Sequence, residues 1–199
     1  EVLLPRGSVL VFEEGGMLVN GKLAGSQTEL KCNSPRAILG KDLLLSGKWT
    51  NKEIEVAWWD CYSDGKQDDY VPLHNISLSV SEMKKAKLVF PEKAKYCVGI
   101  TFCDERSGSD KRDYVFDFSG CNVDIQMNGT TITVAPNGYT RYTLFMFRNN
   151  AKFSISDGHL IGDRIGHDYT ASYYPKTHEF CFGIDVRGSE GTITNMNIE

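Results

Sequence analysis

The chain has 199 residues, of which 41% are hydrophobic and 24% are charged. These values exclude a disordered or collagen-like chain and favour one globular domain. The formal net charge of −4 argues against a protein that coats nucleic acid, because phosphate binding requires a basic surface. No apolar run approaches the roughly 20 residues that a membrane-spanning helix needs.

Short strands separated by turns are predicted over the first fifty residues. The pair Asn20-Gly21 is a strong tight-turn signal, and Gly25-Ser26 marks a further break. Strands this short and this evenly spaced are typical of all-β proteins. The predicted strands are Val9–Phe12, Met17–Val19, Lys22–Ala24, Thr28–Cys32 and Leu43–Leu45.

One stretch, over about residues 69–84, has the pattern of a helix. Asp68 and Asp69 offer an N-cap, and Pro72 is tolerated in a first turn. A basic pair, Lys84-Lys85, suits the C-terminal end. The spacing predicts a single apolar face made of Leu73, Ile76, Val80 and Met83. A strand, Lys87–Phe90, follows and is stopped by Pro91.

A loose internal repeat occupies the second half of the chain. Residues 118–125, 147–155 and 186–193 align with one another, so that Ile125, Ile155 and Ile193 are equivalent. Each copy continues into a second short strand, at 130–134, 159–161 and 197–198. Repeated short strands with insertions of variable length indicate a solenoid, in which each copy buries its apolar face on the next. An ordinary β-sandwich with chance similarity is the alternative.

Four segments, in this order, resemble right-handed parallel β-helix proteins of the pectate-lyase-like superfamily. Leu4–Gly25 is similar to the entry segment, and Trp58–Asp69 is similar to the aromatic and acidic box that precedes the capping helix. Leu88–Tyr96 resembles the start of the first coils, and Gly162–His167 resembles a loop of polysaccharide-processing or phage-borne members. Tyr70 departs from the pattern, which has a small residue there, and Ala94 replaces a typical glycine region.

The resemblance implies an all-β fold, a right-handed parallel β-helix whose N-terminal end is closed by an α-helix at about 69–84. Residues 1–57 would be the entry segment, 58–95 the motif and capping helix, and 96–199 the coils, all in one structural domain. Ile193 and Ile198 occupy inward positions of a coil that should have a successor. We therefore expect the chain to be the N-terminal part of a longer protein, or its last coil to be covered by a partner.

The resemblance also implies an extracellular protein that processes polysaccharide as a glycoside hydrolase or lyase. It carries no catalytic residue onto this chain, and the catalytic coils are expected to lie beyond it. A second hypothesis is a non-catalytic glycan-recognising module of a phage tail or cell surface, and a third is a rigid spacer or shaft. We expect a polysaccharide partner, a homo-oligomer (a trimer if tailspike-like), no nucleic acid, membrane, cofactor or metal, and a cell-surface, periplasmic or virion location.

A polar insertion between two repeat copies is the candidate binding site, because binding residues are common in such loops. It contains Asp163, Arg164 and His167, with His178 and Glu179 at its far side. The alternative is that Asp163 pairs with Arg164 to stiffen the loop, capped by His167. Aromatic rings suit the apolar faces of sugars, or they pack the loop onto the stack; the rings concerned are Tyr169, Tyr173 and Tyr174.

Other chemically suggestive residues are expected to be structural. Trp58 and Trp59 are predicted to pack in the core or against the cap, with a platform for a sugar ring as the alternative. Three acidic residues lack the alternating spacing of a calcium loop and are better explained by a turn and the helix N-cap; these are Asp64, Asp68 and Asp69. The cysteines show no zinc spacing and are predicted to be free, mostly buried thiols; they are Cys32, Cys61, Cys97, Cys103, Cys121 and Cys181.

Overall fold

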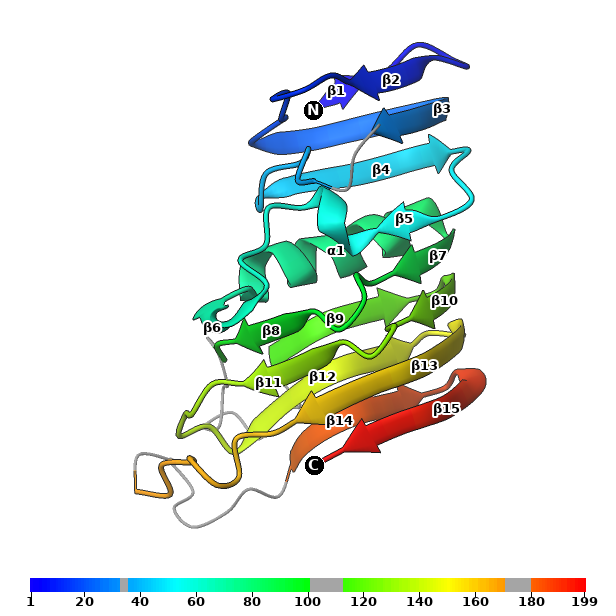
Figure 1. Cartoon of the computed structure of the whole chain (residues 1–199). Coiled ribbons are helices and arrows are strands. Elements are labelled where there is room, and N and C mark those ends of the chain that lie inside the picture. Colours follow the sequence, from blue (N-terminus) through cyan, green and yellow to red (C-terminus); the bar gives the residue numbers. More distant parts are fainter. Residues whose placement is uncertain (33–35, 101–112, 171–179) are drawn as a thin grey trace.

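The computed structural model describes residues 1–32, 36–100, 113–170 and 180–199. Within these ranges, fifteen strands and one α-helix, α1 (Tyr70–Met83), form a stack of layers, with the N-terminus at one end and the C-terminus at the other (Figure 1). Among the described residues, every pair of strands is parallel. The prediction of an all-β fold is confirmed, and the β-sandwich alternative is wrong, because sandwich sheets are antiparallel.

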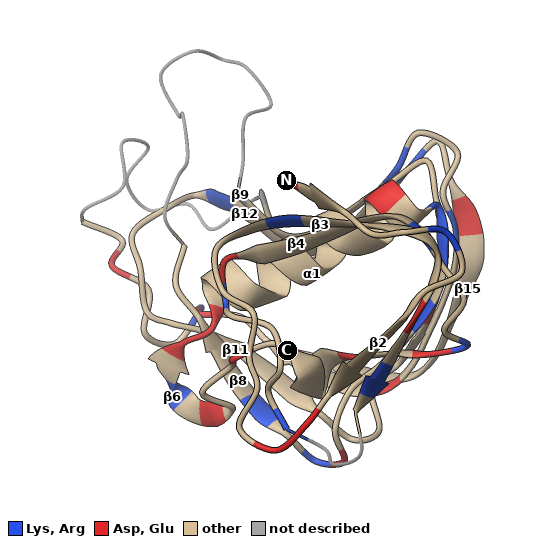
Figure 2. Cartoon of the chain, turned by 90° about the horizontal axis from the view of Figure 1, so that it is seen from above, with Lys and Arg blue, Asp and Glu red and all other residues tan. Residues whose placement is uncertain are grey.

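The strands form three sheets. The first contains β1 (Val2–Leu3), β2 (Val9–Phe12), β3 (Gly21–Cys32) and β4 (Leu43–Trp49). The second contains β5 (Ile54–Glu55), β6 (Asp64–Asp68), β7 (Lys85–Val89), β8 (Lys95–Val98), β10 (Asn122–Gln126), β11 (Thr131–Val134), β13 (Lys152–Ile161) and β15 (Glu190–Ile198). The third contains β9 (Asp113–Ser119), β12 (Arg141–Arg148) and β14 (Phe180–Arg187). These curled parallel sheets make a half-barrel, seen from above in Figure 2, that is compatible with a solenoid.

Two details of the N-terminal strands differ from prediction. The two strands expected at 22–24 and 28–32 are one strand, β3, because Gln27 adopts a left-handed conformation (φ 54°) at a register shift and the strand continues through it. The strand expected at Met17–Val19 is reduced to a single bridge between Leu18 and Leu39. The strand predicted at Val9–Phe12 is confirmed as β2.

The internal repeat is confirmed by the register of the strands. Ile125 on β10 pairs with Ile155 on β13, which pairs with Ile193 on β15. The same ladder extends backwards through Leu88 on β7 to Ile54 on β5. Identical inward positions therefore lie one above another, and the apolar side chains of successive layers form one continuous core.

Stacked aromatic rings form part of this core. Phe116 and Phe145, on neighbouring strands, have ring centroids 4.4 Å apart, and Phe147 stacks on Phe153 at 3.8 Å. Trp58 and Trp59 are buried as predicted. The indole N–H of Trp59 donates to the Leu43 carbonyl at 3.0 Å, so its polar atom is satisfied.

Helix α1 lies within the predicted range, and Leu73, Ile76 and Val80 are fully buried. Its capping differs from prediction. Asp69 occupies the N-cap position without a side-chain capping bond, because its carboxylate accepts the Tyr62 and Ser63 N–H groups instead. The carboxylate of Asp68 accepts the Tyr70 N–H at 2.9 Å and also the Gly99 N–H at 2.8 Å.

The helix lies between β4 and β9, inside the stack (Figure 1). Serine hydroxyls on its two sides bond the strands: Ser79 Oγ accepts the Leu45 N–H at 2.9 Å, and Ser77 Oγ accepts the Asp117 N–H at 3.0 Å. These bonds satisfy strand edges that would otherwise be unpaired. The expectation that α1 closes the N-terminal end needs correction, since the first sheet lies on its other side.

The last layer exposes apolar side chains at the inward positions of the repeat. Ile193 is 49% exposed and Ile198 is 48% exposed, whereas their ladder partners Ile155 and Leu160 are fully buried. Cys61, Cys97 and Cys121 are free thiols, as predicted, although of these only Cys121 is fully buried; Cys103 lies outside the described residues. None of the described helices has the length and apolar character to cross a membrane.

Candidate functional site

The loop that follows β13 contains a buried polar cluster centred on Asp163. The Asp163 carboxylate accepts the Tyr142 hydroxyl at 2.7 Å and lies 2.7 Å from Nδ1 of His167. The backbone N–H of Asp163 donates back to the Tyr142 hydroxyl at 3.2 Å. Because Tyr142 belongs to β12, the cluster ties the loop to the third sheet. Burial raises the pKa of Tyr142, so the phenol stays protonated and continues to donate.

This geometry corrects the predicted Asp163–Arg164 pair. The Asp163 carboxylate contacts Tyr142, His167 and the N–H of Asn137, and the His167 side chain is buried, whereas Arg164 is exposed. Tyr169 packs edge-on against the His167 ring at 4.6 Å, and its hydroxyl donates to the Arg164 carbonyl at 3.3 Å. The structure thus places four predicted residues in one loop and joins three of them, Asp163, His167 and Tyr169, by direct contacts. The other four, Tyr173, Tyr174, His178 and Glu179, lie outside the described residues.

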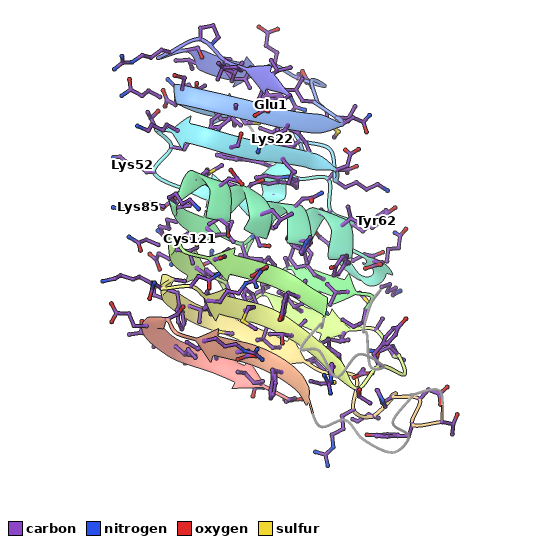
Figure 3. All side chains as sticks on the ribbon, turned by 180° about the vertical axis from the view of Figure 1, so that it is seen from behind. Glu1, Lys22, Lys52, Tyr62, Lys85 and Cys121 are labelled. Atoms are coloured by element: carbon purple, nitrogen blue, oxygen red, sulfur yellow. The ribbon has the colours of Figure 1, made fainter. Side chains whose placement is uncertain are left out.

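A groove that the sequence did not predict lies on the side of the stack where β4 leads into β5. Its volume is about 660 Å³. Residues of three successive segments line it, including Gln27 at the bulge of β3, Trp49 to Lys52 with Ile54, and Lys85 to Lys87 on β7. Figure 3 shows Lys52 and Lys85 projecting from the same edge of the molecule. The groove therefore crosses the junction between the first and second sheets.

Hydrogen bonds fix the segment that forms one wall of the groove. The Asn51 side chain pairs with the backbone of Leu30, accepting its N–H at 2.9 Å and donating to its carbonyl at 2.8 Å. The N–H of Thr50 donates to the Thr28 carbonyl at 2.8 Å. These contacts anchor Thr50 and Asn51 to β3, and Trp49 and Lys52 flank this anchored pair in the sequence.

Trp49 is the aromatic residue of the groove and is only partly buried. Its indole N–H donates to the Ser46 carbonyl at 2.7 Å. Its ring lies against the backbone of Gly25, where an added Cβ would be 2.7 Å from the ring. The ring is thus held in place by a neighbour that must be small. The hydrophobic pattern gave no signal for this role, because Trp49 simply ends a strand.

The charges around the groove are unevenly compensated. Lys87 is held by Glu53 at 2.7 Å, which raises the Lys87 pKa, and it pairs in register with Asp124 on its other side. Lys85 shares the same face of β7, but its neighbour in register is the neutral Asn122. In the part of the chain that the structure describes, Lys48, Lys52 and Lys85 form no ion pair. Three cations of the groove are thus uncompensated.

The described residues offer little for metal binding or hydrolysis. They contain no group of three or more His, Cys, Asp or Glu side chains arranged to hold a metal ion. The Asp64 carboxylate accepts the Lys66 and Gln67 N–H groups, which is the turn predicted for this residue. Asp124 is the one carboxylate lining the groove, whereas glycoside hydrolysis requires a pair.

Comparison with known proteins identifies relatives over about a third of the chain. The SPbeta prophage-derived uncharacterized protein YorA of Bacillus subtilis is 43% identical over 67 residues, which are 33% of this chain and 11% of that protein. The uncharacterized protein YclG of the same organism is 33% identical over 73 residues, which are 36% of this chain and 12% of that protein. The alignments therefore span about an eighth or less of each relative. No family model and no solved structure matches the chain.

Proposed function

We propose that the chain is part of a right-handed parallel β-helix of the pectate-lyase-like type that binds polysaccharide along its side. The in-register ladder from Ile54 to Ile193 supports the β-helix, because each layer buries its inward residues on the next. The sequence segments that resemble this superfamily support the same assignment.

The observation that carries the function is the groove beside Trp49. A partly exposed indole ring fixed on a glycine backbone offers an apolar surface, and sugar rings present complementary apolar faces. The wall of the groove is anchored to β3, so little ordering entropy is lost when a ligand binds. A groove open along the side of a stack also accommodates a long chain.

The described residues support binding of a polysaccharide better than its cleavage. The groove is lined by a single carboxylate, Asp124, and that carboxylate already accepts the Ser154 hydroxyl. The buried Asp163–His167 pair positions a loop. Hydrolase or lyase activity in a longer protein remains the second candidate. One relative is described as prophage-derived, which supports a phage tail or cell-surface module and an extracellular setting.

A panel of soluble polysaccharides tests this proposal. We expect the protein to retain at least one of them in affinity electrophoresis, with no new reducing ends and no unsaturated uronates after long incubation. Trp49→Ala should abolish retention and Trp49→Phe should preserve part of it, with thermal denaturation confirming that both variants are folded. Retention that is unchanged in a folded Trp49→Ala variant would place binding elsewhere, and product formation would favour the enzyme.

A further inference from the structure

We propose that the groove selects an anionic polysaccharide, whose charged groups are held by Lys48, Lys52 and Lys85. This inference rests on the proposed function and adds the chemical class of the ligand. Lysines at an open site attract carboxylates, sulfates or phosphates as point charges without demanding one geometry. The shared chemistry is therefore a regularly charged sugar chain.

The charge balance within the groove singles out these three lysines. Lys87 is the fourth lysine of the lining, but Glu53 and Asp124 flank it on both sides and cancel its attraction for an anion. Lys48 and Lys52 lie on either side of Trp49 in sequence, and Lys85 lines the same groove from β7. Among the described residues, three lysines without an ion pair thus line the same groove as its one aromatic ring, in a protein of net charge −4.

A second depression continues the groove toward the N-terminal end of the stack. It has a volume of about 430 Å³ and shares Gln27 and Lys48 with the main groove. Arg6 lines it, and its Nε–H donates to the Gln27 side chain at 2.8 Å. A ligand that occupies both depressions would meet Arg6, Lys48, Lys52 and Lys85 in succession. This arrangement suits a polymer better than a single small anion.

The same features disfavour nucleic acid as the ligand. Binding of a continuous phosphate backbone requires many cations with few anions among them, whereas Glu53 and Asp124 lie at this site. Single-stranded nucleic acid also requires a succession of aromatic rings, and Trp49 is the one aromatic residue among those that line the groove.

The test compares alginate, dextran sulfate, neutral dextran and an oligothymidylate as ligands of the full chain, with affinities measured by isothermal titration calorimetry. We expect alginate or dextran sulfate to bind and dextran to bind at least about tenfold more weakly. Which of the two binds better assigns the charged group as carboxylate or sulfate. Raising the salt concentration should weaken binding, because the charges are solvent-exposed.

A triple variant, Lys48→Gln, Lys52→Gln and Lys85→Gln, should lose about tenfold or more in affinity for the anionic chain. The matched control removes three exposed lysines outside the groove, in Lys41→Gln, Lys66→Gln and Lys93→Gln. It changes the net charge equally and should bind like the parent. Equal losses of affinity in both triple variants would mean that net charge alone controls binding, and would overturn the inference.

The remaining outcomes separate this inference from the proposed function. If dextran binds as tightly as the anionic chains, polysaccharide recognition stands and the selection for charge is wrong. If the oligothymidylate binds more tightly than every polysaccharide, the ligand class is wrong. If no polysaccharide binds the parent protein, the proposed function itself fails.

Discussion

Phe116 on β9 and Phe145 on β12 lie face to face, with ring centroids 4.4 Å apart and ring planes 5° apart. The two residues are partners in a parallel pair of strands, and Ile184 on β14 continues the row. The contact follows from the repeat, because equivalent residues of successive layers stack directly on one another. It explains why the stability of this protein should depend on the layer in which a core residue lies.

Ile155 and Ile193 provide a matched pair for testing this dependence. They occupy the same ladder position, but Ile155 is fully buried and Ile193 is half exposed. Ile155→Ala should lower the free energy of unfolding by about 2–5 kcal/mol, because it leaves a cavity between two layers. Ile193→Ala should cost less than half as much. Urea denaturation measures both values, and equal losses would contradict the stacked arrangement.

The Tyr142 hydroxyl should stabilise the loop after β13. Tyr142→Phe removes the donor to the Asp163 carboxylate and leaves a buried acceptor short of a partner. We expect a loss of about 1–3 kcal/mol in the free energy of unfolding. The control is Tyr169→Phe, whose exposed hydroxyl makes a longer bond of 3.3 Å and whose removal should cost within about 0.5 kcal/mol. An unchanged free energy of unfolding in Tyr142→Phe would mean that the Tyr142–Asp163 hydrogen bond does not stabilise the loop.

Glu55 should make stability depend on pH. Burial raises the pKa of Glu55, nearby Glu53 raises it further, and Lys87 opposes the shift. A raised pKa means that the ionised form costs stability above the folded-state pKa, and that the cost disappears as the pH falls through it. Glu55→Gln should therefore raise the melting temperature at pH about 7 and have little effect at pH about 4. A larger stabilisation at the lower pH would contradict the sign of this shift.

The thiols should react slowly in the folded protein. Burial raises the pKa of Cys61, Cys97 and Cys121, and for Cys97 the charges of Asp68 and Asp69 add to the effect. The thiolate is the reactive form, so alkylation at pH about 8 should be slower at these sites than for a free peptide thiol. Mass spectrometry after iodoacetamide treatment locates the modified residues, and unfolding in urea should remove the protection. Rapid labelling of folded Cys61 would contradict the raised pKa of its thiol.

The repetitive part of the fold was predictable because its determinants are periodic. Inward Ile and Phe residues recur in each copy, and those residues form the ladders. The joined strand β3 was not predictable from Gly25-Ser26, since the left-handed turn falls on Gln27 and preserves the strand. The helix was predictable from its apolar spacing, whereas its place between β4 and β9 depends on serine hydroxyls that pair with distant strands.

The candidate sites were less predictable because their contacts are distant in sequence. The partner of Asp163 is Tyr142 on another strand, whereas the sequence suggested its neighbour Arg164. The groove combines β3, the β4–β5 connection and β7, and no local motif links Trp49 with Lys85. Charge compensation is equally non-local, since only the register shows that Lys87 pairs with Asp124 and Lys85 with Asn122.

The proposed binding site for polysaccharide is the groove beside Trp49. Amide hydrogen exchange with and without saturating alginate tests it most directly, because it locates the bound chain on the protein. Slower exchange at residues 48–54 and 85–88, with residues 162–170 unchanged, is the predicted result. Protection confined to 162–170, or absent everywhere under conditions where the polysaccharide is bound, would contradict the claim.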